Sequence, residues 1–176
     1  MELFGNYMDF AKIVAETPYD ARPHGVSCSF IRISKDKGIK LYPNHSERES
    51  TYNMQHEASL AGLAPKVFQK FGVKEKSGYN IYGYVTEAVE ETLYDLFISW
   101  AKLHMTFHGV SSHWFLPEKL QKQPIYQYGA SCYEGCVGGL KKELEVLFSE
   151  VRDMHSNNTG FLNGEVVCID LGEFRW

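Results

Sequence analysis

Residues 152–172 read RDMHSNNTGFLNGEVVCIDLG, and this stretch decides the fold that the sequence predicts. Its Asn163-Gly164 pair is the strongest short signal for a β-hairpin, because both central residues of a type I′ turn need positive φ. The apolar residues on either side of the pair predict the two strands of that hairpin. Folding back on the turn would bring Asp170 toward Asn158, which lies twelve residues earlier in the chain.

Three polar residues of this stretch have the chemistry that phosphoryl transfer needs, which is mainly positioning and charge neutralisation. Asp153 lies on a turn after a predicted helix, where its carboxylate can accept the proton of an incoming hydroxyl. Asn158 offers an amide oxygen to a metal ion, and Asp170, at the end of an apolar strand, offers a carboxylate. Taken singly, an Asp-x-Gly after a strand is more often a plain turn, so the ordered combination is what favours catalysis.

Length and composition are those of a soluble globular protein with one domain, or with two small lobes that share a cleft. The chain has 176 residues, of which 44% are hydrophobic and 14% aromatic, enough for a sizeable core. A formal net charge of −4 without a basic run argues against nucleic acid as a partner. No apolar stretch approaches the roughly 20 residues that span a bilayer, and no signal peptide is evident. We therefore expect a cytoplasmic protein that does not bind membranes.

The first half of the chain predicts a leading helix over residues 3–16, followed by two β-hairpins with a helix between them. Residues 26–33 and 39–42 are rich in β-prone side chains and flank a polar turn. Residues 66–73 and 79–86 show the same pattern around a second polar turn. The expected order is therefore strand, strand, helix, strand, strand.

The helices are predicted from caps and from apolar spacing. Ser46, with Glu49 three residues later, is expected to cap the helix between the hairpins. Apolar residues at helical spacing predict two further helices, over residues 93–103 and 140–151. Residues 105–131 have a mixed composition and support no assignment.

Residues 152–172 resemble the catalytic loop and metal-binding strand of the eukaryotic-like protein kinase superfamily. The His-Ser-x-Asn form is similar to that of small kinases encoded by tailed bacteriophages and of some compact bacterial kinases. The resemblance spans roughly residues 25–174 and implies an α+β, reduced kinase-like bilobal fold. Residues 1–90 would form an antiparallel-sheet N-lobe with one main helix, and residues 91–176 a truncated helical C-lobe.

The resemblance also implies an ATP-phosphate site in the first half of the chain. Lys40 is similar to the strand lysine that reaches the α and β phosphates, and Glu57 sits where the family's helix supplies the glutamate that pairs with it. Gly25 lies in the loop that would cover the phosphates. Taken singly, a strand lysine or a helix glutamate is more often a solvated charge, so the assignment depends on their order.

Residues 84–89, followed by residues 92–96, resemble the hinge between the lobes and the start of the next helix. On this basis Thr86 would be the gatekeeper residue next to the adenine site. Backbone groups of Glu87 and Val89 would form hydrogen bonds with adenine. These three assignments come only from the resemblance.

The sequence departs from the family pattern in several places. The loop at 23–29 has one glycine where the family has several, Val151 replaces the histidine before Arg-Asp, and Leu171 replaces a phenylalanine. The chain also ends four residues after Gly172, before the activation segment and the later helices that dock peptide substrates. We therefore expect a protein that recruits its target through another surface, acts on itself, or has lost catalysis.

The sequence thus predicts an ATP- and Mg²⁺-dependent phosphotransferase, a minimal serine/threonine protein kinase that acts on a host or partner protein in the host cytoplasm. Asp153 would orient the hydroxyl, and Asn158 and Asp170 would hold Mg²⁺. Lys40 would bind phosphates and Glu57 would position Lys40. The alternative is a catalytically weak or inactive pseudokinase, an effector that binds and inhibits a host protein. The glycine-poor loop and the short second lobe motivate that alternative.

Overall fold

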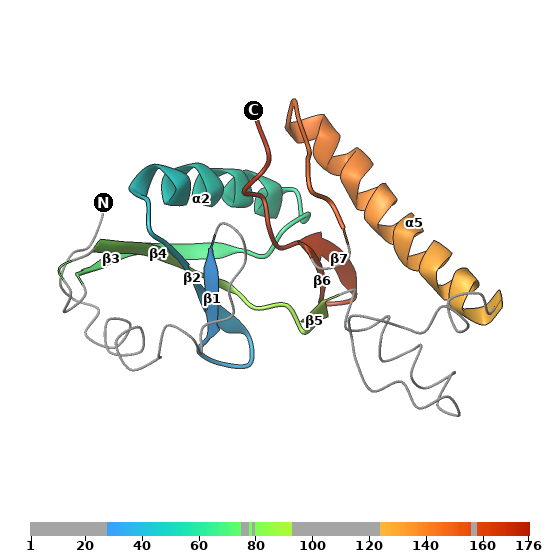
Figure 1. Cartoon of the computed structure of the whole chain (residues 1–176), viewed down its shortest axis with the longest axis horizontal. Helices are drawn as coiled ribbons and strands as arrows, with labels where there is room; N and C mark the ends of the chain where they lie inside the picture. The colour runs from blue at the N-terminus through green and yellow to red at the C-terminus, as the bar shows by residue number, and fades with distance from the viewer. Residues whose placement is uncertain (1–27, 75–77, 79, 93–123, 156–157) are drawn as a thin grey trace. The chain divides into compact units, whose positions relative to one another are not determined.

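The computed structural model divides the chain into two compact units, residues 1–88 and 89–176 (Figure 1). It describes residues 28–74, 78, 80–92, 124–155 and 158–176. The helices expected over residues 3–16 and 93–103 lie outside the described residues. Within the described ranges the protein is α+β, with antiparallel sheets and two helices. The division falls after Ala88, whereas the sequence placed it after residue 90.

Among its described residues, the first unit contains a four-stranded antiparallel sheet and one helix. Its elements are β1 (Ser29–Arg32), β2 (Lys37–Tyr42), α2 (His45–Leu60), β3 (Val67–Lys74) and β4 (Asn80–Glu87). In space the strands follow the order β1-β2-β4-β3, and each neighbouring pair is antiparallel. The structure confirms both predicted hairpins and the helix between them.

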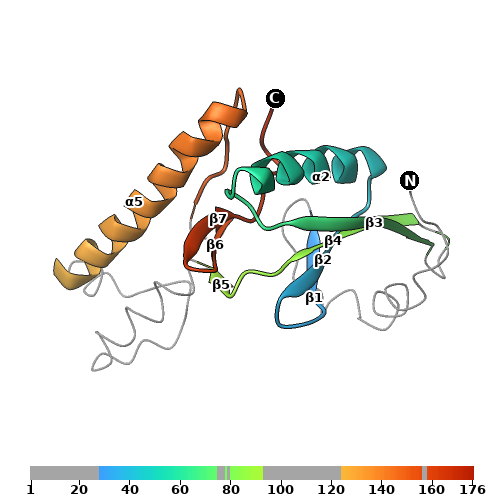
Figure 2. The ribbon, with the colours of Figure 1, turned by 180° about the vertical axis from the view of Figure 1, so that it is seen from behind.

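Strand alternation gives this sheet two buried faces of different character, because successive side chains of a strand point to opposite sides. On one face Ile39 and Leu41 belong to an aliphatic and aromatic cluster together with Val85. On the other face Lys40 lies directly opposite Tyr84 in the neighbouring strand. Helix α2 lies along one side of the sheet in both views of the ribbon (Figure 2). The hydrogen bonds from Lys40 and Tyr84 to Gln55 of this helix show that it covers the second face. Lys40 is therefore enclosed rather than solvated.

Helix α2 is capped by Asn44 and not by Ser46, so the predicted capping box is wrong. The Asn44 backbone is extended, and its side-chain oxygen accepts a hydrogen bond from the Ser46 amide. Glu49, the expected partner of Ser46, instead lies 2.8 Å from the Lys70 ammonium of β3. Asn and Ser cap helices about equally well, so propensity alone does not distinguish Asn44 from Ser46 as the cap.

In the part of the second unit that the structure describes, there are one long helix and a small sheet. The helix is α5 (Pro124–Leu147), and the sheet has the order β5 (Glu91–Thr92), β6 (Thr159–Leu162), β7 (Glu165–Cys168). Helix α5 begins inside the stretch that the sequence left unassigned. Proline is favoured at a first helical position, whereas the glycines at 129, 135, 138 and 139 lower helix propensity. Neither helix in the described ranges has the length and apolar character needed to cross a bilayer.

The core of the second unit follows the predicted apolar stripe. Leu140 and Leu144 on α5, and Phe148 and Val151 after its end, are all buried. The helix predicted to reach residue 151 ends at Leu147, whose side chain is exposed. Phe174, near the end of the chain, packs edge-on against Phe148 with ring centroids 5.6 Å apart. The segment after the β6–β7 hairpin is thus part of this core.

Candidate functional site

The β6–β7 hairpin confirms the turn that the sequence predicts. Asn163 and Gly164 have φ values of 52° and 88°, as a type I′ turn requires. Strand pairing extends from the turn to Thr159 opposite Cys168. One step further, the Ile169 amide donates to the Asn158 carbonyl at 2.9 Å. The hairpin therefore brings the residue before Asp170 into contact with Asn158.

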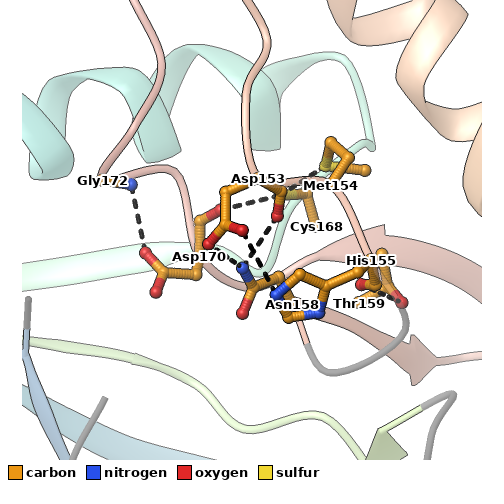
Figure 3. Close-up of polar contacts among 8 residues, drawn as sticks. All are labelled: Asp153, Met154, His155, Asn158, Thr159, Cys168, Asp170 and Gly172. Atoms are coloured by element: carbon orange, nitrogen blue, oxygen red, sulfur yellow. Dashed lines mark hydrogen bonds and ion pairs between the residues drawn. The ribbon is translucent and has the colours of Figure 1, made fainter. Parts of the chain in front are cut away.

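The loop before the hairpin is closed by hydrogen bonds between Asn158 and Asp153 (Figure 3). The Asn158 side-chain nitrogen donates to the Asp153 carbonyl at 2.9 Å and to its carboxylate at 3.0 Å. Asp153 has a φ of 52°, in the left-handed region that costs a residue with a Cβ about 1–2 kcal/mol. The two bonds offset that cost and hold an exposed carboxylate in a defined position.

Asn158 and Asp170 offer the oxygen ligands of a possible metal site. With both amide hydrogens of Asn158 directed to Asp153, its side-chain oxygen has no hydrogen-bond partner among the residues that the structure describes. One oxygen of the half-buried Asp170 carboxylate accepts the Gly172 amide at 3.1 Å, and the second has no hydrogen-bond partner among the described residues. Carboxylate and carbonyl oxygens are ligands that Mg²⁺ prefers, usually together with substrate phosphates. This donor set fits Mg²⁺.

The described part of the chain offers no evident further protein ligand for such an ion. In the described ranges, no three His, Cys, Asp or Glu side chains are grouped so that they could hold a metal. Within those ranges, an ion here would depend on Asn158, Asp170, water and ligand oxygens. Mg²⁺ commonly binds through one or two carboxylates and keeps several waters.

Two neighbours that the sequence interpretation did not include position these groups. His155 Nε2 lies 3.4 Å from the Asp153 carboxylate. The buried Cys168 thiol lies 3.2 Å from the Asp170 carbonyl, as a hydrogen-bond donor, and 3.7 Å from the Met154 sulfur. Cys168 thus links the loop that carries Asp153 to the strand end that carries Asp170.

In the first unit Lys40 is buried, and its amine donates a hydrogen bond to the Gln55 side-chain oxygen at 2.9 Å. The expected pair with Glu57 is not formed, because Glu57 is exposed to solvent. The buried positions of α2 include Thr51, Gln55 and Ala58, which recur at helical spacing. Glu57 lies off that stripe, so its carboxylate points away from the sheet.

Gln55 is the centre of a buried hydrogen-bond network. Its oxygen also accepts the Tyr84 hydroxyl at 2.8 Å. Its nitrogen donates to the Pro65 carbonyl at 2.8 Å and to the Thr86 hydroxyl oxygen at 2.7 Å. Burial raises the pKa of Tyr84, because an ionised phenol would lose its hydration there. Both hydrogens and both acceptor positions of the Gln55 amide are therefore used.

The remaining residues of the expected nucleotide site are distributed as follows. Thr86 is buried, and its hydroxyl belongs to the Gln55 network. The Glu87 amide donates to the Lys66 carbonyl at 2.8 Å, so this N–H is not available to adenine. Val89 belongs to the second unit, and Gly25 lies outside the described residues.

Each unit thus holds part of the predicted set, Lys40 and Thr86 in the first and Asp153, Asn158 and Asp170 in the second.

Sequence reasoning missed Gln55. The apolar spacing carried no clear signal for it, because the buried face of α2 on which Gln55 lies also contains the polar residues Arg48 and Thr51. The chain matches no protein-family model, and no curated protein matches its sequence.

Proposed function

We propose that the chain is an ATP- and Mg²⁺-dependent phosphotransferase with a kinase-like fold, acting on serine or threonine hydroxyls of a partner protein. The observation that carries this proposal is the bonding of Asn158. Its amide hydrogens hold the Asp153 carboxylate, its amide oxygen is left for a ligand, and the hairpin brings its backbone beside the strand that ends at Asp170.

Each side chain has a defined role in this proposal. Asp153, held at its carbonyl and at one carboxylate oxygen, orients the attacking hydroxyl and accepts its proton. Asn158 and Asp170 hold Mg²⁺, which neutralises charge on the transferring phosphate. Lys40 supplies a buried positive charge for the phosphates. Positioning and charge neutralisation are the main requirements of this chemistry.

Two features of the fold support the kinase-like interpretation. The first unit has the order strand, strand, helix, strand, strand, with Lys40 on the second strand and the helix directly after it. In the second unit a tight hairpin separates the Asp153–Asn158 loop from the strand end at Asp170. Both arrangements are those that the sequence resemblance implies.

Thermal unfolding with ATP, with and without Mg²⁺, tests this function. A ligand that binds only the folded state raises stability, by about 2.7 kcal/mol at a concentration 100 times its Kd. We expect the midpoint temperature of unfolding to rise most when ATP and Mg²⁺ are both present. Lys40→Met should reduce the effect of ATP, and Asp170→Asn the additional effect of Mg²⁺. An unchanged midpoint with ATP and Mg²⁺ together would refute the proposal.

One observation favours a second candidate function. In this alternative the chain is a kinase-derived protein that binds and inhibits a partner without catalysis. The residue of helix α2 that binds the Lys40 amine is Gln55, a neutral amide. The protein kinase superfamily has a glutamate in this role. Inhibition of a partner that persists undiminished in an Asp170→Ala variant would support this candidate. Loss of inhibition in that variant would support catalysis.

A further inference from the structure

We infer that Gln55 is the positioning residue for Lys40, holding its amine in place for the phosphates of a nucleotide; this rests on the proposed nucleotide-binding function. The contact is a buried hydrogen bond of 2.9 Å between two side chains fifteen residues apart in the sequence. Lys40 is fixed on a central strand and Gln55 on the helix that lies along the same face. Gln55 would thus perform the role that the sequence resemblance assigned to Glu57.

The oxygen of Gln55 restrains the amine together with Tyr84. Both the Lys40 amine and the Tyr84 hydroxyl donate to this one oxygen. Lys40 and Tyr84 also lie opposite each other on β2 and β4, and the amine is 5.8 Å from the Tyr84 ring centroid. A long side chain is thereby held in one conformation, which lowers the entropy lost when a ligand binds.

The nitrogen of Gln55 fixes the orientation of its amide. It donates to the Pro65 carbonyl, which can only accept, while the Lys40 ammonium can only donate. The amide oxygen must therefore face Lys40, and the nitrogen must face Pro65 and Thr86. A carboxylate at this position could still accept from Lys40 but could not donate to the Pro65 carbonyl.

The two halves of the amide therefore have separable effects. The oxygen accepts a hydrogen bond from Lys40 and therefore affects the affinity for phosphates. The nitrogen donates to Pro65 and Thr86 and therefore affects the stability of the folded protein. A neutral amide also orients the amine without adding a negative charge beside it. A residue that only filled the core would affect stability and leave phosphate affinity unchanged.

The test compares Gln55→Met, which has a similar length and lacks both halves of the amide, with Gln55→Glu, which keeps the acceptor. Asn53→Asp is the matched control, since it makes the same amide-to-acid change at an exposed position of α2. The affinities for ATP with Mg²⁺ and for adenosine are measured by calorimetry at a temperature where each protein is folded. Adenosine has no phosphates, so it reports only on the rest of the nucleotide site.

We expect Gln55→Met to weaken ATP binding about tenfold, equivalent to about 1.4 kcal/mol, and to leave adenosine binding unchanged. Gln55→Glu should restore the ATP affinity to within about threefold of the wild type, with a lowered unfolding midpoint, because only the donor bonds are lost. The control should match the wild type in both measurements. Equal weakening of ATP and adenosine binding by Gln55→Met would overturn the inference.

The binding measurements distinguish failure of this inference from failure of the proposed function. If Lys40→Met weakens ATP binding and Gln55→Met does not, the inference is overturned and the proposed function stands. If the wild type does not bind ATP, both are overturned. Should Gln55→Met fail to fold, the side-chain amide resonances of Gln55 in the wild type give the answer by NMR. They should shift when ATP and Mg²⁺ are added, and unchanged resonances would overturn the inference.

Discussion

The side-chain amide of Asn158 donates hydrogen bonds to both the main-chain carbonyl and the carboxylate of Asp153, at 2.9 and 3.0 Å. These bonds join two residues five positions apart and hold Asp153 at a positive φ. They also determine which end of the amide faces outward, because the nitrogen is the donor. The proposed metal ligand and the proposed base thus depend on each other.

Replacing Asn158 by Asp should therefore disrupt the loop. The new carboxylate cannot donate to the Asp153 carbonyl, and it places two like charges together. We expect the free energy of unfolding to fall by about 1–3 kcal/mol, measured in urea. The loss of unfolding free energy should be smaller when Mg²⁺ is added, because the cation neutralises both charges.

Asn163→Asp is the matched control for this substitution. It makes the same change within the same unit, at a turn position that accepts either residue. Its unfolding free energy should stay within about 0.5 kcal/mol of the wild type. A similar loss in both variants would show that the Asn158–Asp153 bonds are not the cause.

Removal of either proposed catalytic carboxylate should abolish phosphate transfer and leave the fold intact. Asn is the suitable replacement for Asp153, because Asn tolerates the left-handed region. Asp153→Asn and Asp170→Asn should each lower the rate of phosphate transfer from ATP to a protein substrate by about 10²-fold or more. Glu165→Gln, an exposed charge on β7, is the control and should retain the wild-type rate. Full activity in both Asp variants would contradict the assigned roles.

Local signals predicted much of the fold and part of the site. Asn163-Gly164 specifies its turn through backbone conformation alone, so the hairpin and the contact between Asn158 and Ile169 follow from the sequence. The two hairpins of the first unit also follow, because each is built around its own polar turn. These features need no information from distant residues.

The partner of Lys40 could not be predicted in this way, because it depends on which face of α2 meets the sheet. Glu57 carries the expected charge, yet Gln55 lies on the buried face. The length of α5 was missed for a related reason. Its glycines oppose a helix locally, and the buried side chains of Leu140 and Leu144 outweigh that preference.

Two glycine substitutions should have opposite effects on stability. Gly164 has a φ of 88°, which strains any residue with a Cβ, so Gly164→Ala should destabilise the protein by about 1 kcal/mol. Gly138 lies within α5, and a Cβ built there meets no atom within 4 Å. Gly138→Ala should therefore stabilise the protein by about 0.5–1 kcal/mol. Chemical denaturation of both variants measures the difference, and effects of the same sign would contradict this account.

The buried phenol of Tyr84 should make stability depend on pH in the alkaline range. Burial raises its pKa above the ordinary value of 10.0, so the folded state keeps the neutral form where the unfolded chain ionises. The stabilising contribution is present below about pH 10 and is lost as the pH rises through the folded-state pKa. Tyr84→Phe should cost about 1 kcal/mol at pH 7, because the bond to Gln55 is lost, and should flatten the decline above pH 10. Urea unfolding between pH 8 and 11 measures both effects, and equal slopes above pH 10 for the variant and the wild type would contradict the role of this buried phenol.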